Sequence, residues 1–452
     1  MLRNTLFRLS SSVQTHDNKR RLVTIVCQQS WYSTKNSGVE FKASGVQVND
    51  KLYDRDDWTN VTPSVLAKLD RKLHLQERNP IGIIRQLIEG HFNDFRTFND
   101  LSPVVTTRQN FDDLLIPKDH PSRTKSDNYY FNKDTVLRAH TSAHQLEGLA
   151  SGANKFLISG DVYRRDEIDS SHYPVFHQIE GLAYFDGQSK GEADVVAAIQ
   201  ADLEKAKPIP SNIEIVDDTI IHPGNPLQGR HSEAVVTPLV AHLKHSINSM
   251  ICHLFADEPN LKVRWIEAYF PFTSPSYEVE IYYQGEWLEV LGCGVVQQAL
   301  LDKGDRHHAV GWAFGMGLER LAMVLFGIPD IRLFWSQDSR FIDQFTPGQI
   351  KKFQAFSKYP PCIKDISFWL PPTEWHDNNF CETVRGVAGD LVENVKLIDD
   401  FTHSKTNKRS LCYRITYRSM DRNVTNDEIN EIQEKVRSTV EQDFGVELRE
   451  KK

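Results

Sequence analysis

Several features that define common protein classes are missing from this 452-residue sequence. No apolar run reaches the length of about 18 residues that marks a membrane-spanning helix, so no membrane segment is predicted. The six cysteines are scattered and form no Cys-x-x-Cys pair, which argues against a zinc ribbon and a disulfide framework. The Gly-x-x-x-x-Gly-Lys-Ser/Thr loop and the paired motifs of protein kinases are also lacking. These two common kinds of phosphate-binding site are therefore not expected in this chain.

An overall positive charge is lacking as well. Acidic residues outnumber lysine and arginine by 61 to 53, which gives a formal net charge of -8. This balance argues against nonspecific coating of nucleic acid, although a local basic surface would be sufficient for a specific nucleic-acid partner.

The N-terminal segment, residues 1–37, has a composition unlike the rest of the chain. Asp17 is its only acidic residue, while basic residues alternate with short apolar groups and many serines and threonines. The apolar runs are too short for a secretory signal peptide. This composition is typical of an organelle transit peptide and predicts mitochondrial import. The alternative is a disordered tail.

The segment from Gly311 to Arg320 has the chemistry of a phosphate site. Apolar residues lead into Gly315 and Gly317, and a helical pattern starts at Leu318. Glycines let the backbone approach an anion, free N–H groups at a helix start point towards it, and Arg320 adds charge. A tight turn with a surface arginine is the plainer interpretation of this segment alone.

A second block, Gly160 to Gly181, supplies complementary chemistry. Arg164 and Arg165 follow each other near a predicted strand end, so they must face opposite ways. Phe176 offers a flat surface for a purine ring. On the returning strand Gln178 and Glu180 share a face, which makes a clamp for an ammonium group.

The apolar patterns predict an α+β fold. Helices are expected over 81–95, 195–205, 233–255 and 318–325, and strands over 156–163, 178–185, 263–270, 277–283 and 287–291. This order indicates an antiparallel sheet with helices packed on it. The region after about residue 358 has the order β-α-β-β-α-β, which is the ferredoxin-like fold.

Together these blocks resemble class II aminoacyl-tRNA synthetases. Arg164 with Asp166 and Phe176 resembles their motif 2, Gly315 to Arg320 their motif 3, and the helix over 81–95 followed by Pro103 their motif 1. The segments Arg138–Gln145, Phe176–Glu180, Phe270–Phe272 and Leu291–Gly294 resemble phenylalanyl-tRNA synthetase, in its single-chain mitochondrial form. The middle, residues 185–232, matches least.

The resemblance implies a domain plan. We expect a transit peptide over 1–37, a class II catalytic domain over 38–335, a linker over 336–357 and a ferredoxin-like anticodon-binding domain over 358–452. It also implies a monomer in the mitochondrial matrix, although motif 1 builds dimers in most relatives. No stretch is left over for an editing domain.

The implied activity is ATP-dependent attachment of phenylalanine to the 3′ end of tRNA(Phe), with Mg²⁺ accompanying ATP. Arg164 would bridge the amino acid carboxylate and the α-phosphate, and Arg320 would hold the γ-phosphate. The other implied nucleotide contacts are Asp166, His172, Phe176 and Glu289, of which Glu289 is also the candidate metal ligand. The other implied amino acid contacts are His140, Ser142, Ala143, His144, Gln145, Ser171, His172, Tyr173, Gln178, Ile179, Glu180, Phe270, Phe272, Glu289, Ala313, Phe314 and Gly315.

The tail carries a candidate RNA surface. From Lys405 to Arg418 the sequence has five basic residues and no acid, and basic sheet surfaces beside aromatics suit single-stranded loops. The candidate tRNA contacts are Lys405, Lys408, Arg409, Arg414 and Arg418. Two rival functions stay open: a synthetase-like protein that binds RNA or an amino acid without catalysis, and an unrelated ATP-dependent kinase or ligase.

Overall fold

The computed structural model describes residues 38–187, 191–209, 213–258, 261–283, 285–356 and 359–449. The expected transit peptide lies outside the described residues. Within them, no helix has both the length and the apolar character needed to cross a membrane.

An eight-stranded sheet forms the centre of the fold, with the strand order β10-β11-β12-β13-β14-β9-β8-β4. The five inner pairs of neighbouring strands run antiparallel. The two pairs at the edges of the sheet, β10 with β11 and β4 with β8, run parallel. The strands are β4 (Arg96–Phe98), β8 (Lys155–Tyr163), β9 (Val175–Asp186), β10 (Glu214–Asp217), β11 (Lys262–Ala268), β12 (Thr273–Tyr283), β13 (Glu286–Val296) and β14 (Ala309–Gly317).

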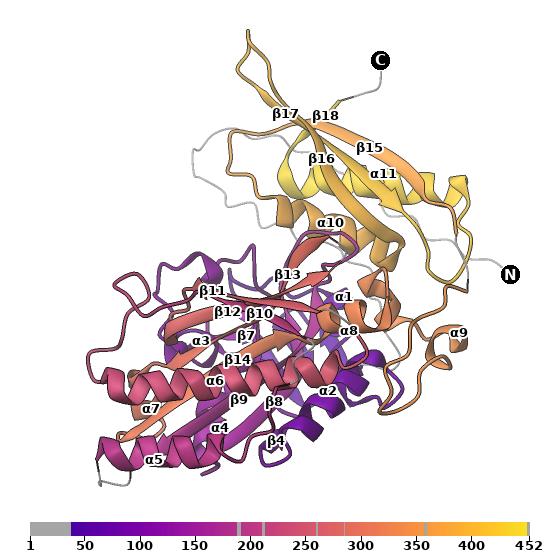
Figure 1. Cartoon of the computed structure of the whole chain (residues 1–452). Coiled ribbons are helices and arrows are strands. Elements are labelled where there is room, and N and C mark those ends of the chain that lie inside the picture. Colours follow the sequence, from indigo (N-terminus) through magenta and orange to yellow (C-terminus); the bar gives the residue numbers. More distant parts are fainter. Residues whose placement is uncertain are drawn as a thin grey trace, which may run out of the picture. The chain divides into compact units, whose positions relative to one another are not determined.

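Long amphipathic helices cover one face of this sheet. They are α2 (Pro80–His91), α5 (Glu192–Leu203), α6 (Glu233–Leu254) and α8 (Leu318–Phe326). Figure 1 shows α5 and α6 lying along the strands, and the apolar sides of these helices belong to one continuous core with the sheet. Asn79 accepts a hydrogen bond from the N–H of Ile81 and so caps α2, while Gly327, with a φ of 67°, ends α8.

Smaller elements cover one end of the opposite face and form a second core there. They include a three-stranded sheet of order β5-β7-β6, built from β5 (Val104–Thr106), β6 (Tyr130–Asn132) and β7 (Thr135–Leu137). The helical parts are α3 (Thr107–Asn110), η2 (Asp112–Leu114), η3 (Pro121–Arg123), η4 (Thr141–His144), α4 (Gln145–Ala150) and α7 (Gln298–Lys303). The middle strands therefore carry helices on one face and the small elements on part of the other.

The chain before α2 forms a separate three-stranded sheet and two short helices. These are β1 (Val39–Phe41), β2 (Gly45–Val48), β3 (Lys51–Asp54), α1 (Pro63–Leu66) and η1 (Leu73–Leu75). After α8 comes η5 (Ile331–Trp335), whose buried Phe334 and Trp335 pack into the main core. The helix α9 (Ser339–Ile342) lies in the predicted linker.

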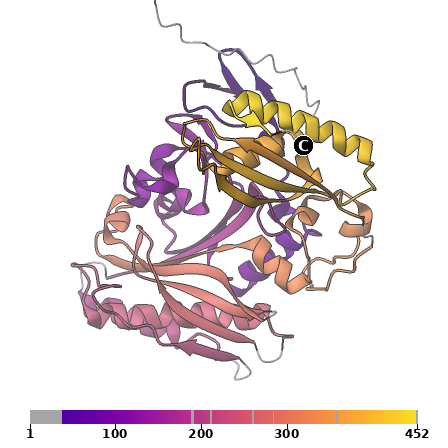
Figure 2. The ribbon, with the colours of Figure 1, turned by 90° about the horizontal axis from the view of Figure 1, so that it is seen from above.

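The C-terminal region folds as predicted, with four antiparallel strands in the order β16-β17-β15-β18. Its elements are β15 (Cys362–Trp369), α10 (Asp377–Ala388), η6 (Gly389–Leu391), β16 (Val392–Thr402), β17 (Arg409–Tyr417), α11 (Asn426–Phe444) and β18 (Glu447–Leu448). One face packs on α10 and α11 through alternating residues such as Ile366, Phe368 and Ile415. Figure 2 shows α11, in yellow, beside these strands. The α+β class and the ferredoxin-like tail are thus confirmed.

The sequence from Phe98 to Val105 predicts one strand interrupted by Pro103, and this prediction was wrong because the segment contributes to two separate strands. Arg96–Phe98 forms β4 and pairs with β8, whereas Val104–Thr106 forms β5 in the small sheet. Pro103 falls between them, where its missing N–H interrupts no ladder. The region 207–229 likewise contains an unpredicted edge strand, β10.

Candidate active site

Arg164 and Arg165 leave the end of β8 in different directions. Arg164 donates a hydrogen bond from Nε to the carbonyl oxygen of Ala139 at 2.8 Å, and its guanidinium lies 5.2 Å from the ring centroid of Phe176. Arg165 instead donates to the carbonyl oxygen of Lys125 at 2.7 Å. Burial and the nearby Arg320 lower the pKa of Arg164. Among the described residues Arg164 has no ion-pair partner, so an anionic ligand is its natural counterpart.

Arg320 lies in the first turn of α8, and its side chain contacts Glu289 on β13. Its Nη1 donates to the carbonyl oxygen of Glu289 at 3.1 Å and lies 3.6 Å from the Glu289 carboxylate. The Arg164 guanidinium feels both the positive charge of Arg320 and the negative charge of Glu289. The two arginines therefore lie close enough for their charges to influence each other, although they are separated by more than 150 residues of sequence.

Beside the two arginines, the candidate site contains a buried carboxylate, that of Glu180 on β9. Only 2 % of its surface is exposed. Ser142 and Gln145 donate hydrogen bonds to its two different oxygens, and Thr141 donates at 3.5 Å. Burial raises the pKa of Glu180 to about 7, against the opposing effect of these donors. The structure thus offers a dry carboxylate that a cationic ligand would ionise.

Some polar atoms of His140 and Gln145, which flank η4, have no hydrogen-bond partner among the described residues. They are both ring nitrogens of His140 and the Oε1 of Gln145, and all three are buried. Burial, and then the charge of Arg164, lower the pKa of His140 to about 3, so its ring is neutral. Gln178 accepts a hydrogen bond from the backbone N–H of Thr141 at 3.3 Å. Buried unpaired polar groups are destabilising by about 1–3 kcal/mol each, so this set favours a polar ligand.

A row of glycines runs across the sheet beside Glu180. Gly292, Gly315 and Glu180 are direct neighbours on β13, β14 and β9, so their side-chain directions share one face. A Cβ on Gly315 would meet no atom within 4 Å, whereas one on Gly292 would lie 2.6 Å from the ring of Phe270. Phe270 stacks on Phe272 with centroids 5.9 Å apart. Open space over Gly315 and these two rings form the apolar end of the site, and Ala313 lies two residues before Gly315 on the same face.

Several residues expected to contact the amino acid support the site from behind. Ile179 and Phe314 are buried in the core on the helix-covered face, and Ala143 is buried in the second core. Tyr173 donates to Asp390 at 2.6 Å. His144 is bonded to Arg138 and to Glu147 rather than to Glu180. These five side chains shape the segments that carry the lining residues.

The loop between β8 and β9 is ordered by a residue that sequence reasoning missed. Asp169 accepts hydrogen bonds from the N–H groups of Ser171 and His172 and from the His172 ring at 2.8 Å. The Asp169 contact raises the pKa of His172. Asp166 accepts from the N–H of Glu167 at 2.8 Å. The aspartate preceding two polar residues by two and three positions was a detectable turn signal.

Glu319 is a second missed residue. Its buried carboxylate accepts hydrogen bonds from the backbone N–H and from Nδ1 of His177, each at 2.7 Å. His177 lies between Phe176 and Gln178, and Glu319 precedes Arg320. The pair therefore ties the part of β9 that carries Phe176 and Gln178 to the start of α8. The position of Glu319 directly before Arg320 in the sequence was the signal that could have indicated its place beside the site.

Acidic side chains also gather next to Arg320. Burial, followed by the charges of Glu289 and Glu280, raises the pKa of Glu278. No group of three or more His, Cys, Asp or Glu side chains in the described part of the chain could hold a metal ion by itself. One or two carboxylates completed by phosphate oxygens and water is the arrangement that Mg²⁺ prefers.

Two family models match most of the chain. A model of the class II core domain (F) of tRNA synthetases matches residues 68–197 and 235–345, and a model of the ferredoxin-fold anticodon-binding domain matches 357–449. The chain is 46% identical over 422 residues to the chloroplastic/mitochondrial phenylalanine–tRNA ligase of Arabidopsis thaliana, covering 91% of this chain and 88% of the relative. The chain belongs to the phenylalanine–tRNA ligase family. The mitochondrial ligases of Saccharomyces cerevisiae (46% identity, covering 90% of this chain and 96% of the relative) and Mus musculus (47%, 90% and 89%) are similarly close.

Membership of the phenylalanine–tRNA ligase family confirms the resemblance found in the motifs. The class II match skips residues 198–234. This gap includes the edge strand β10 and lies mostly within the region that resembled the family least.

The candidate RNA surface of this ligase-family chain is less basic than its sequence suggests. Four of the five cations lie close to carboxylates: Lys408 to Glu447 (2.9 Å), Arg409 to Asp400 (2.9 and 2.8 Å), Arg414 to Asp365 (2.9 and 3.1 Å) and Arg418 to Glu393 (3.2 Å). Lys405 is exposed. Arg414 lies with aromatic side chains on the sheet face that α10 and α11 leave uncovered, whereas Arg409 shares the strand face of Leu411 and Tyr413.

Trp369 and Phe401 form an aromatic row on either side of Ser410 in the C-terminal sheet. Trp369 and Phe401 flank Ser410 on the neighbouring strands, so all three share a face. The ring centroid of Trp369 lies 6.3 Å from that of Phe401, and Arg449 stacks 5.0 Å from the ring of Trp369. Phe401 is 43% exposed.

Proposed function

We propose that this protein attaches phenylalanine to the 3′ end of tRNA(Phe) through a phenylalanyl-adenylate and works in the mitochondrial matrix as a monomer. The proposal is supported by the named relatives, which are mitochondrial phenylalanine–tRNA ligases, and by the arrangement of two arginines around one space. The transit-like composition of residues 1–37 supports the location.

In the first step a carboxylate oxygen of phenylalanine attacks the α-phosphorus of ATP. The bond from that phosphorus to the bridging oxygen of the β-phosphate breaks, and pyrophosphate leaves with the electron pair. Arg164 reduces the repulsion between the two anions and holds them in line, while Arg320 holds the γ-phosphate. Fixed charge and positioning supply the catalysis, so no side-chain nucleophile is needed. Phe176, below the Arg164 guanidinium, offers its ring to the adenine.

Mg²⁺ would supply positive charge at the β- and γ-phosphates. Glu289 is the proposed protein ligand, with Glu278 as its neighbour. Burial first, and then the negative charges of Glu289 and Glu280, raise the pKa of Glu278, and a cation bound nearby would oppose the effect of these charges. Asp166 and His172 complete the proposed nucleotide contacts.

The amino acid would lie with its ammonium group at Glu180 and Gln178 and with its phenyl ring over Gly315. Ser142 and Gln145 hold the Glu180 carboxylate, and His140 offers a neutral nitrogen nearby. Phe270, Phe272 and Ala313 would contact the ring. In the second step a terminal ribose hydroxyl of tRNA attacks the activated carbonyl, and AMP leaves.

The observation that carries this proposal is the convergence of Arg164, Arg320 and the Glu180 clamp. Exchange of labelled pyrophosphate into ATP by the purified protein, tested with each of the twenty amino acids, distinguishes the candidate functions. We expect phenylalanine to give the highest rate. The same protein without exchange for any amino acid would contradict the proposal and favour a binding protein without catalysis.

The anticodon region is proposed to bind through Lys405, Lys408, Arg409, Arg414 and Arg418 together with the aromatic row. Since stacking of a base on an aromatic side chain contributes about 1–3 kcal/mol, Trp369→Ala and Phe401→Ala should each lower kcat/KM for tRNA by about tenfold. Exchange of pyrophosphate in the absence of tRNA should stay unchanged. Aminoacylation kinetics with varied tRNA(Phe) provide the measurement.

Tyr282→Ala is the matched control for the aromatic row, because Tyr282 is equally exposed, at 44%, but lies on the central sheet. It should leave kcat/KM for tRNA within about twofold of the unmodified protein. A loss as large as that of Trp369→Ala would show that the row has no special role.

A further inference from the structure

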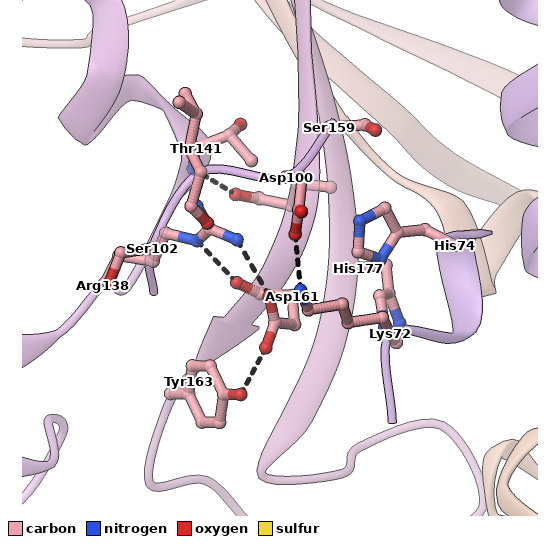
Figure 3. A network of polar contacts seen from close by, with 12 residues as sticks. Lys72, His74, Asp100, Ser102, Arg138, Thr141, Ser159, Asp161, Tyr163 and His177 are labelled. Atoms are coloured by element: carbon pink, nitrogen blue, oxygen red, sulfur yellow. Dashed lines mark hydrogen bonds and ion pairs between the residues drawn. The ribbon is translucent and has the colours of Figure 1, made fainter. Parts of the chain in front are cut away.

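The side chain of Arg138 lies along the edge of β8, beyond the point where the neighbouring strand β4 ends. β4 pairs with Phe156–Ile158 alone, so within the described part of the chain no strand continues beside the end of β8. The Nε of Arg138 donates to the carbonyl oxygen of Asp161 at 2.7 Å, and its Nη2 donates to the Asp161 carboxylate at 2.8 Å. The Tyr163 hydroxyl donates to the other carboxylate oxygen, as Figure 3 shows. The Arg138 side chain thus makes hydrogen bonds at the part of the β8 edge that β4 does not cover.

The Arg138–Asp161 pair is buried and ionised. The two side chains are 1% and 5% exposed. Burial alone would raise the pKa of Asp161, but Arg138, His177 and Tyr163 outweigh it and hold the pKa below its ordinary value. A Cβ on Gly160 would lie 2.0 Å from the Nη2 of Arg138, so the guanidinium fits only against a glycine. Because a buried ion pair adds little stability over apolar replacements, its value lies in the geometry it imposes.

The pair extends to His144. The Nη1 of Arg138 lies 2.9 Å from the His144 Nε2, and the His144 Nδ1 lies 3.0 Å from the Glu147 carboxylate. Arginine only donates, so the Nε2 must accept and the proton resides on Nδ1. Burial lowers the pKa of His144, which agrees with a neutral ring. His144 is therefore fixed at both nitrogens.

His144 is the last residue of η4, the single turn that carries Ser142, and it precedes Gln145, the first residue of α4. Ser142 and Gln145, two residues before it and one after it, bond opposite oxygens of Glu180. The turn has no side-chain cap of its own at His140. We propose that Arg138 and His144 are positioning residues that hold Ser142 and Gln145 on Glu180 and thereby set the affinity for the ammonium group of the amino acid. This inference rests on the proposed function and deepens it.

Two substitutions of His144 test the idea. His144→Leu removes the acceptor for Arg138, whereas His144→Gln keeps an acceptor and a donor. We expect His144→Leu to raise KM for phenylalanine about tenfold in pyrophosphate exchange, as for one lost charged hydrogen bond, with KM for ATP within twofold. His144→Gln should restore KM for phenylalanine to within about threefold of the unmodified protein. A loss of stability alone would not separate the two Michaelis constants.

His231→Leu is the control, because His231 is also buried and bonded, to Gln298 at 3.0 Å, outside the site. It should leave both KM values unchanged. If His144→Leu fails to fold, Tyr163→Phe decides, since it removes only the hydroxyl that holds Asp161 and should raise KM for phenylalanine alone.

Unchanged KM for phenylalanine in the folded variants, or an equal rise for ATP, would overturn the inference. Calorimetric titration of phenylalanine gives the same comparison without catalysis. Absence of exchange and of phenylalanine binding in the unmodified protein would instead count against the proposed function.

Discussion

Replacing Arg164 by glutamine is expected to lower phenylalanine-dependent pyrophosphate exchange by about a thousandfold, the upper range for loss of one preorganised charge in an enzyme site. The guanidinium has a neutral partner, the carbonyl oxygen of Ala139, and lies over Phe176, but it has no carboxylate in ion-pair contact among the described residues. Its charge is therefore free to act on the reacting anions. The fall should be mainly in kcat, because the attraction grows as carboxylate and phosphate approach each other.

The neighbouring arginine supplies a control with the same chemistry. Arg165→Gln removes an equal charge one residue away, but Arg165 points to the carbonyl oxygen of Lys125. We expect it to retain exchange within about tenfold, with its main effect on thermal stability. Steady-state exchange kinetics of both variants provide the measurement. If the Arg165 variant lost as much activity as the Arg164 variant, the assignment of roles would be wrong.

Glu180→Gln is expected to make the protein more stable and nearly inactive. Burial raises the pKa of Glu180 from 4.5 to about 7, so at higher pH the ionised carboxylate destabilises the ligand-free fold by about 3 kcal/mol. Glutamine removes that charge and keeps an acceptor for Ser142. The substrate ammonium group, however, loses its anion, and KM for phenylalanine should rise by about a hundredfold or more.

The sign of the pH effect follows from the raised pKa. Between pH 4.5 and about 7 the folded protein binds more protons at Glu180 than the unfolded chain does, so stability from this group falls as pH rises. The stability gained by Glu180→Gln should be absent near pH 4.5 and complete above about pH 7. Urea unfolding at several pH values measures it. Glu204→Gln, at an exposed position, should show no such trend.

A decrease in the stability of Glu180→Gln above pH 7 would contradict this account. Phenylalanine binding adds an independent check. Since the ammonium group prefers the ionised carboxylate, binding near pH 7 should release protons, which calorimetry in buffers of different ionisation enthalpy detects.

The central elements of the fold could be predicted because their signals are local. The apolar stripe of α6, the alternation in β17 and the glycine-arginine pattern around β14 each lie within one continuous segment. Motif spacing was sufficient to indicate the family. The strand β10 was missed because an exposed edge strand has no strong alternation.

The site was only partly predictable. Ser142, Gln178 and Glu180 lie around one clamp, but neighbouring residues of the same motifs, Ile179 and His144, point elsewhere. A motif specifies residue types in order, whereas contact depends on which face of the strand or turn each one occupies. The role of Glu319 required knowing that α8 begins beside β9.

The amino-acid sequence by itself determined the α+β class, the ferredoxin-like tail and the family, since periodicity and motif order are properties of the chain. Only the tertiary structure decided the electrostatics. Burial gave Glu180 a pKa of about 7, and cross-strand neighbours paired Arg409 and Arg414 with carboxylates. The pKa and the ion pairing of a charged group depend on its exposure to solvent and on its neighbours in space, and the order of residues alone determines neither.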